Sequence, residues 1–320
     1  MSTRLALITG GTGFIGRSVL RKLVEAGYTV RTLLKPARRS PHLPTGVPVE
    51  VALAALSDAR GLRASLVGVR TVIHLAGAER TGDAAALQAA DVEGTRAMAE
   101  AAAEAGVERF VYVSHLGANR SAAYPVLRAK ALAEEHLRDS GVPYTILRSG
   151  VVFGAQDHFT VALAMMLAAS PILFLMPGDG STLLQPIWVE DLATIITWAL
   201  EDASTRFRTY ELGGPEFISL AQVVQMIMPA AGVTRILVPT RQPYLRAGAW
   251  LMGRILPRPP LTPFWLDYLA ANRTAGLDSV PRTFGLQPAR LEAHLDHLRG
   301  HNWEWELLGR QFSPRRGEAA

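Results

Sequence analysis

Three glycines near the start of the chain carry the strongest chemical signal in the sequence. Gly10, Gly13 and Gly16 stand three residues apart, after an apolar run and before a segment with helical spacing of apolar residues. In this order they suit a tight turn, the close approach of backbone to a pyrophosphate, and close helix–strand packing. Unpaired amides at the helix start favour an anion, whereas a lone glycine-rich loop would say little. The residues expected at this dinucleotide site are Gly10, Thr12, Gly13, Phe14, Ile15 and Gly16.

The end of the second expected strand bears on which nicotinamide cofactor is bound. An acid about twenty positions after the glycine turn would bind the ribose 2′-hydroxyl of NAD. The sequence after Leu34 instead reads Lys-Pro-Ala-Arg-Arg, without an acid. Lys35, helped by Arg31, Arg38 or Arg39, is available for a 2′-phosphate, which favours NADP(H) over NAD(H). The alternative is that these cations form only a solvated loop.

The elements that must position these groups alternate between strand and helix. Apolar strands are expected at 29–34, 49–53, 71–78, 109–113 and 144–147, with helices between them. This rhythm predicts an α/β fold, a Rossmann-type doubly wound parallel sheet with helices on both faces. The rhythm loosens beyond Gly150. We expect an NAD(P)-binding domain at 1–155, a smaller α/β lobe on the substrate or partner side at 156–305, intertwined with the first, and a polar tail at 306–320.

Composition excludes several classes of function. The chain has 320 residues, of which 49% are hydrophobic and 19% charged, as expected for a globular protein. The absence of cysteine excludes disulfides and thiolate chemistry. The net charge of +5 is spread along the chain, which argues against nucleic-acid binding. His294 and His297 lack a carboxylate partner, so no metal site is expected. Without a basic-then-apolar leader at its start, the chain is expected to be cytoplasmic, and its oligomeric state is left open.

Further motifs accompany the glycine turn along most of the chain. They are TGGTGFIG at 9–16, VIHLAG at 72–77, VEGT at 92–95, FVYVS at 110–114 and KALAEE at 130–135. Together they resemble the extended or atypical short-chain dehydrogenase/reductase superfamily from about Leu5 to Leu298. QPIWVEDLA at 185–193 and YELGGP at 210–215 are similar to the NmrA-like group. Within that group, the likeness is to the NADPH-carrying accessory subunit of respiratory complex I and its bacterial relatives.

The resemblance implies roles for further residues. Lys35 would hold the 2′-phosphate and Lys130 the nicotinamide ribose. The segment 147–152 would carry backbone around the nicotinamide. This chain departs from the family at Ala55, where an acid often contacts adenine, so that only packing or backbone remains there. The residues concerned on the adenosine and nicotinamide sides are Leu56, Leu75, Ala76, Gly77, Ser114 and Val151.

The catalytic groups of the family are incomplete. Catalytic members carry a Tyr four residues before the Lys, where the ammonium lowers the phenol pKa for proton exchange during hydride transfer. This chain has Val126 at that position and Leu116 at the position of the substrate-orienting Ser. The remaining candidates for proton transfer are Ser114, His115, Tyr124 and Lys130.

Two hypotheses follow for the function. In the first, the protein binds NADP(H) with little or no turnover and is a structural, assembly or sensing module. In the second, it is an NAD(P)H-dependent oxidoreductase on a carbonyl, sugar-nucleotide or quinone-like substrate, with His115 as an attractive proton donor because its pKa suits neutral pH.

One segment bears on partners. Residues 244–256, from Tyr244 to Leu256, form an expected apolar helix with arginines. Such a helix suits a membrane surface or a membrane-complex partner, which would make the protein peripheral at the membrane. The alternative is that its apolar face closes over the cofactor cleft.

Overall fold

The computed structural model describes residues 4–37, 43–78, 83–260 and 262–312. The chain divides into two compact units. Unit 1 is the described part of Met1–Ser149 together with Val189–Leu212. Unit 2 is Gly150–Trp188 together with the described part of Gly213–Arg315. Each unit is considered on its own below.

Unit 1 is built on one seven-stranded parallel sheet. Its spatial order is β11-β6-β5-β4-β1-β2-β3. The strands are β1 (Leu5–Thr9), β2 (Thr29–Leu34), β3 (Val49–Leu53), β4 (Thr71–His74), β5 (Arg109–His115), β6 (Tyr144–Ser149) and β11 (Arg208–Leu212). The expected Rossmann-type doubly wound fold is confirmed. The chain order reverses between β1 and β4, which is where sheets of this kind bind ligands, beyond the carboxyl ends of their strands.

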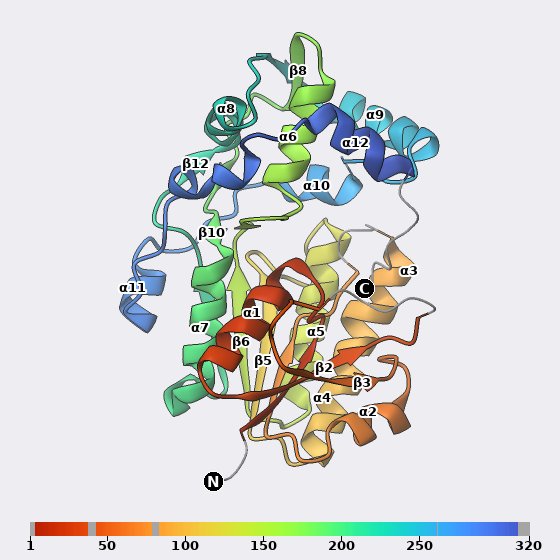
Figure 1. Cartoon of the computed structure of the whole chain (residues 1–320), viewed down its shortest axis with the longest axis vertical. Helices are drawn as coiled ribbons and strands as arrows, with labels where there is room; N and C mark the ends of the chain where they lie inside the picture. Colours follow the sequence, from red (N-terminus) through yellow and green to blue (C-terminus); the bar gives the residue numbers. More distant parts are fainter. Residues whose placement is uncertain (1–3, 38–42, 79–82, 261, 313–320) are drawn as a thin grey trace. The chain divides into compact units, whose positions relative to one another are not determined.

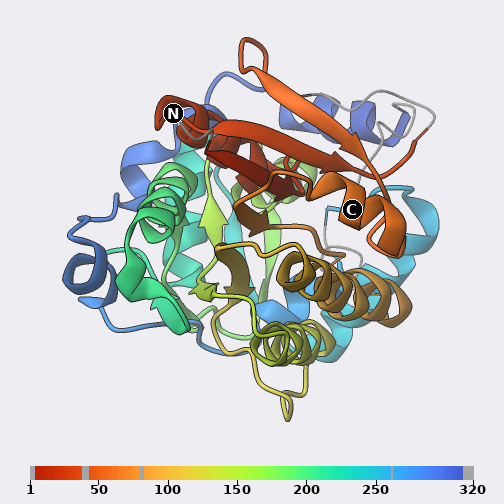
Figure 2. The ribbon, with the colours of Figure 1, turned by 90° about the horizontal axis from the view of Figure 1, so that it is seen from below.

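Helices cover both faces of this sheet. They are α1 (Phe14–Glu25), α2 (Ala59–Ser65), α3 (Ala84–Leu87), the π-helix η2 (Gln88–Glu93), α4 (Gly94–Glu104), α5 (Pro125–Asp139), α7 (Val189–Glu201) and the 3₁₀ helix η3 (Ala203–Thr205). Figures 1 and 2 show α1 and α7 on one face and α2, α4 and α5 on the other. A parallel sheet covered on both faces explains why its inner strands are apolar at successive positions.

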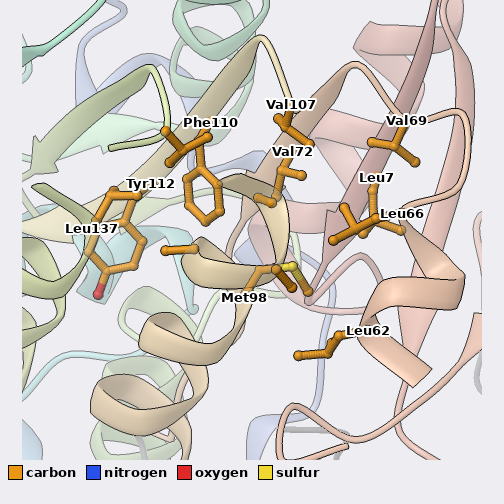
Figure 3. Close-up of a cluster of buried hydrophobic side chains, with 14 of the residues drawn as sticks. Leu7, Leu62, Leu66, Val69, Val72, Met98, Val107, Phe110, Tyr112 and Leu137 are labelled. Atoms are coloured by element: carbon orange, nitrogen blue, oxygen red, sulfur yellow. The ribbon is translucent and has the colours of Figure 1, made fainter. Parts of the chain in front are cut away.

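The core of unit 1 lies between the sheet and the layer of α2, α4 and α5. Leu7 of β1 and Val72 of β4 meet Leu62 of α2 and Met98 of α4 there, as Figure 3 shows. Ala6 and Ile8 of β1 are equally buried and face the opposite layer, because side chains alternate along a strand. The strand β1, which leads into the glycine turn, is therefore fixed by packing on both sides.

Residues 189–212 complete unit 1 although they come late in the chain. Glu190 of α7 accepts hydrogen bonds from Ser18 and Arg21 of α1, at 2.8 and 2.7 Å. Buried Arg109 of β5 donates to the carbonyl of Ala199 and to the hydroxyl of Thr205. The strand β11 then pairs in parallel with β6. The segment expected to form one lobe over 156–305 is thus shared between the two units.

Unit 2 is built from helices and three two-stranded sheets. Its sheets pair β10 with β7 and β13 with β8 in parallel, and β12 with β9 antiparallel. The strands are β7 (Val152–Phe153), β8 (Leu173–Pro177), β9 (Leu183–Leu184), β10 (Ile187–Trp188), β12 (Ile218–Ser219) and β13 (Ile236–Thr240). The helices are α6 (Thr160–Ala169), α8 (Leu220–Ala230), α9 (Gln242–Ile255), α10 (Pro263–Tyr268), α11 (Ser279–Phe284), η4 (Leu291–His294), η5 (Asp296–Leu298) and α12 (Trp303–Phe312).

The centre of unit 2 is α6, which is apolar and mostly buried and packs against α8 and α12. A capping box between Ser219 and Gln222 fixes the start of α8. In the part of the chain that the structure describes, no helix combines the length and apolar character needed to cross a bilayer.

Candidate functional site

The glycine turn of unit 1 presents unpaired backbone amides at the start of α1. Gly13 is the N-cap residue, no side chain caps the helix, and its first turn holds no acid. The Gly13 amide donates to the Gly10 carbonyl at 3.0 Å, and the first helical bond runs from the Arg17 amide to the Gly13 carbonyl. The amides between these positions have no acceptor within the helix. This end of α1 fits a diphosphate, which would supply the missing acceptors.

Two glycines of the turn admit no side chain. Gly10 has φ +72°, and a Cβ there would lie 2.8 Å from the carbonyl carbon of Leu75. A Cβ on Gly16 would lie 2.2 Å from the carbonyl oxygen of Gly10. Gly11, which sequence reasoning did not single out, is restricted by a side chain instead of backbone, since its Cβ would lie 2.4 Å from Thr32 Oγ1. The turn is therefore held tightly between α1 and the neighbouring strands.

A buried hydrogen-bond network joins the turn to the end of β4. Thr9 Oγ1 accepts from the amides of Leu75 and Ala76, at 3.2 and 3.3 Å, and lies 2.8 Å from His74 Nδ1. His74 Nε2 lies 3.1 Å from Thr95 Oγ1. Burial, helped by the charge of Lys130, lowers the pKa of His74 to about 3, so its ring is neutral. The network brings the predicted adenosine-side segment beside the glycine turn.

Lys130 of α5 is buried and paired. Its Nζ lies 3.0 Å from Asp91 Oδ1, and both side chains are almost completely inaccessible to solvent. The other carboxylate oxygen of Asp91 accepts from the Ala78 amide at 2.7 Å. Gly77 leaves room for this carboxylate, because a Cβ on Gly77 would lie 2.7 Å from Asp91 Oδ1. Lys130 Nζ also lies 5.5 Å from the centre of the Tyr112 ring.

The cations predicted for the 2′-phosphate separate in the structure. Lys35 is exposed just beyond the end of β2, which neighbours β1. Arg31 instead donates to Glu50 of β3 at 2.8 and 3.0 Å, and to the carbonyls of Ser65 and Val67 at 2.8 and 2.9 Å. These bonds commit Arg31 to the β2–β3 edge. Arg38 and Arg39 lie outside the described residues.

Leu56, predicted on the adenine side, is half-buried and packs against the core of unit 1. A Cβ on Gly94 would lie 2.7 Å from Leu56 Cδ1, so the start of α4 leaves room for this leucine. Val151 belongs to unit 2, where it is buried and its carbonyl accepts from the Ile187 amide at 2.9 Å.

The candidate proton donors at the end of β5 have other contacts. Ser114 is buried, and its hydroxyl donates to Glu134 Oε1 at 2.7 Å. Arg148 binds both oxygens of the same buried carboxylate, at 2.9 and 2.7 Å, and Arg138 donates to it at 2.8 Å. The hydrogen bond to Glu134 raises the pKa of Arg148. Ser114 thus belongs to a charged cluster between α5 and β6.

The remaining candidates lie at the ends of these elements. His115 is half-buried at the end of β5, and Tyr124 is the extended N-cap residue of α5, just ahead of its first turn. Val126 and Leu116, which stand at the family's Tyr and Ser positions, are 6% and 2% exposed. No three His, Cys, Asp or Glu side chains within the described ranges gather as a metal site would require.

Sequence reasoning missed Asp91, Glu134 and the pair of Thr9 and His74. One signal was available for Asp91: it is the acid directly before the VEGT motif at 92–95, and a buried lysine requires a carboxylate. Glu134 lies four residues after Lys130, and this helical spacing favours a pair between the two residues that the structure does not contain. His74 gave no chemical signal, because a histidine in an apolar strand is compatible with many roles.

Comparison with known proteins identifies the family of the chain. A family model described as NAD(P)H-binding matches residues 10–161. Subunit 9 of the NADH dehydrogenase [ubiquinone] 1 alpha subcomplex of Mus musculus is 30% identical over 319 residues, which cover 94% of this chain and 81% of that protein. The chain belongs to the NAD(P)H-binding family that contains this subunit 9. The predicted kinship with the complex I accessory subunit is confirmed.

Other relatives of this NAD(P)H-binding protein share less of its length or identity. The Arabidopsis thaliana alpha subcomplex subunit 9 is 31% identical over 70% of this chain, and the match spans 57% of that relative. The Photosystem II assembly factor Ycf39 of Cyanophora paradoxa is 26% identical over 72% of this chain and 71% of its own.

Solved structures show the same fold. The crystal structure of gox2253 is 25% identical to this chain, covers 97% of it and 100% of its own chain, and superposes with a TM-score of 0.75. The UDP-glucose 4-epimerase of Thermotoga maritima is 18% identical, covers 94% and 98%, and has a TM-score of 0.71. This second likeness concerns the fold alone.

Proposed function

We propose that the protein binds NADP(H) with little or no turnover and acts as a structural, assembly or sensing module. One observation carries the proposal: the backbone cradle at Gly10, Gly13 and Gly16 is intact, while buried Val126 and Leu116 stand where catalytic relatives have proton-handling groups. Dinucleotide binding through backbone amides does not need those side chains. Reduction of a carbonyl does need them, because a proton must reach the substrate oxygen as the hydride reaches the carbon.

The names of the relatives are consistent with such a role. One is a subunit of NADH dehydrogenase and another is a Photosystem II assembly factor. By analogy, we propose that this chain serves a membrane-bound complex, as a peripheral component that contacts a membrane surface or a membrane-complex partner through residues 244–256. The bound dinucleotide would then stabilise unit 1 and report the cofactor supply.

Gly13→Asp tests the binding site through a change that should affect the ligand much more than the fold. Gly13 has φ −71° and ψ 174°, which aspartate, a preferred N-cap residue, can adopt, although its Cβ would lie 3.1 Å from the Gly10 carbonyl oxygen. The ligand-free melting temperature should stay close to that of the wild type. A carboxylate beside the diphosphate should weaken NADPH binding by at least about 100-fold, which isothermal titration measures.

Gly13→Ser is the matched control, since it adds the same Cβ and a capping oxygen without a charge. It should lose clearly less affinity than Gly13→Asp, and the difference between the two variants isolates the effect of the charge. Equal and unchanged NADPH binding by the Asp and Ser variants would refute a diphosphate at this helix start. Absence of any rise in melting temperature with NADPH or NADH in the wild type would refute the proposal as a whole.

We propose Lys35 as the residue that selects NADP(H), since it is exposed beyond β2 while Arg31 is bound by Glu50. Lys35→Glu should lower the ratio of NADPH to NADH affinity by about tenfold or more, because it replaces an attraction to the 2′-phosphate by a repulsion. Lys22→Glu on α1 is the control. An unchanged ratio in Lys35→Glu would remove the assignment.

The second candidate function is a reductase in which His115, Tyr124 or Lys130 supplies the proton. It is favoured by the position of His115 at the carboxyl end of β5. Steady NADPH oxidation with a carbonyl, sugar-nucleotide or quinone panel, lost in a His115→Ala or Tyr124→Phe variant that still binds NADPH, would establish it. Bound NADPH that stays unoxidised across the panel would support the first proposal.

A further inference from the structure

Helix α9 of unit 2 carries two separate apolar stripes. Leu245 and Ala249 are buried, and they pack with Leu266 of α10. Tyr244, Leu251 and Ile255 form a second stripe, about 120° around the helix axis from the first at 3.6 residues per turn. These three side chains are 71%, 52% and 68% exposed. A helix that needed only to pack on its own unit would require one such stripe.

The neighbouring two-stranded sheet continues the exposed apolar surface. β8 pairs with β13, and α9 packs against β8. Leu173 and Leu175 point outward from β8, while Phe174 and Met176, which alternate with them, are buried. Ile236, which pairs with Leu173, is 62% exposed. The outer face of this ribbon is therefore apolar and accessible in unit 2.

The charge along this surface is mainly positive, although Asp179 follows β8 and Asp267 of α10 is paired with Arg246 of α9. Residues 217–266 contain no Asp or Glu. The same segment contains five arginines, Arg235, Arg241, Arg246, Arg254 and Arg258. Arg241 and Arg254 are exposed, and the Arg254 guanidinium lies 4.6 Å from the centre of the Trp250 ring, which is itself 61% exposed. An anionic surface complements this arrangement.

We infer that α9 and the outer face of the β8–β13 ribbon lie on an anionic lipid bilayer. Tryptophan, tyrosine and arginine are the residues that suit the boundary between headgroups and acyl chains, where ring and stem are apolar and the polar end stays hydrated. At 14 residues α9 is too short to span the roughly 30 Å hydrocarbon core, so it would lie in the interface plane.

A second copy of this chain fits the same surface less well. A twofold contact of α9 with its own copy would place Arg254 and Arg241 near their like-charged counterparts without an acid to offset them. An anionic bilayer has no such conflict. The inference deepens the proposed function by naming the partner of residues 244–256, and it rests on that assignment of the surface but not on cofactor binding.

Vesicle flotation of the full chain tests the inference. The wild type should float with phosphatidylcholine vesicles containing phosphatidylglycerol, float much less with phosphatidylcholine alone, and bind more weakly as salt is raised. Brominated lipids should quench the fluorescence of the wild type more than that of Trp250→Phe. A wild type that binds neither kind of vesicle would overturn the inference.

Paired variants separate the apolar and the charged contribution. Trp250→Glu/Leu251→Glu and Leu173→Glu/Ile236→Glu should each weaken vesicle binding by about tenfold or more. The control pair is Phe217→Glu/Leu277→Glu, whose side chains in unit 2 are also exposed, at 43% and 47%. Equal losses in test and control pairs would contradict a specific surface.

For the charges, Arg241→Gln/Arg254→Gln should reduce binding to anionic vesicles by roughly 20- to 30-fold, at about one kcal/mol for each arginine near the membrane. Arg282→Gln/Arg290→Gln, also exposed in unit 2, should leave it unchanged.

The outcome is separable from that of the proposed function. All variants are also titrated with NADPH, and retained binding shows that unit 1 is folded. Circular dichroism and a cooperative melt that matches the wild type show that unit 2 is folded. If the wild type binds vesicles but does not bind NADPH, the lipid inference is supported and the cofactor proposal is refuted. Wild type that dimerises in solution, loses the dimer in Trp250→Glu/Leu251→Glu and ignores vesicles would assign the surface to a second copy and overturn the lipid inference.

Discussion

Two regions of unit 1 lie at the carboxyl ends of β1 and β5, which flank β4 in the sheet, and they differ in how they use their polar groups. At the end of β1, the glycine turn leaves the first amides of α1 without acceptors in the helix, and no side chain caps them. At the end of β5, Ser114 is bound by Glu134, and the nearby Lys130 of α5 is paired with Asp91. Backbone is offered to a ligand in the first region, while side chains satisfy one another in the second. Binding a cofactor and turning it over are thus separable demands on one fold.

A substitution of Lys130 should have the largest effect on the second region, because it removes one partner of a buried ion pair. Lys130→Met leaves the buried carboxylate of Asp91 without its counter-charge, which should lower the free energy of unfolding by about 3–5 kcal/mol. Urea denaturation measures the loss. Asp91→Asn/Lys130→Met should recover part of it, because the amide still accepts from Ala78. Additive losses in the double variant would show that the pair is not coupled, and the second region would then not be self-satisfied.

The buried His74 tests the first region, because its ring is bonded to Thr9 beside the glycine turn. Its folded pKa of about 3 lies below the unfolded value near 6.5, so the unfolded state binds a proton that the folded state refuses. The stabilisation is complete above pH 6.5 and is lost as the pH falls towards 3. Between pH 7 and pH 5, at 1.36 kcal/mol per unit, this amounts to about 2 kcal/mol.

The measurement is urea denaturation of wild type and His74→Asn at several pH values. The free energy of unfolding should fall between pH 7 and pH 5 by about 2 kcal/mol less in the variant than in the wild type. Because Asp157, whose pKa burial raises, titrates in both proteins, the difference isolates His74. Parallel slopes would mean that the ring is accessible to protons in the folded protein.

The smallest expected effect compares two hydroxyls. Ser114→Ala removes one donor from a carboxylate that keeps two arginines, so it should cost about 1 kcal/mol and leave NADPH affinity unchanged. Thr9→Val removes the acceptor of two amides at the end of β4 and should weaken NADPH binding several-fold. An affinity loss in Ser114→Ala alone, measured by titration, would place the cofactor on the second region instead.

Much of unit 1 could be predicted because its signals are local. The strand expected at 29–34 is β2, and that at 49–53 is β3. The glycine turn could be predicted from its residue types, since a positive φ at Gly10 and a close contact at Gly16 require the absence of a side chain. These features depend on neighbours within a few residues.

What sequence reasoning did not reach depends on partners distant in the chain. Helical spacing favours a pair between Lys130 and Glu134, four residues apart. In the structure Lys130 pairs with Asp91, because η2 packs against α5. Glu134 pairs with Arg148, because β6 also packs against α5. The pairing of β11 with β6 likewise has no local signature. Such contacts follow from topology rather than from residue types.

The return of residues 189–212 to unit 1 limits how the protein can be cut. A fragment that ends near residue 150 would lack α7 and β11, and β6 would become an open edge whose amides and carbonyls invite another chain. Arg109 would lose the Ala199 carbonyl and the Thr205 hydroxyl, which accept hydrogen bonds from it. A recombinant nucleotide-binding module must therefore span both segments, and a protease that nicks the chain near either crossing should leave the pieces associated.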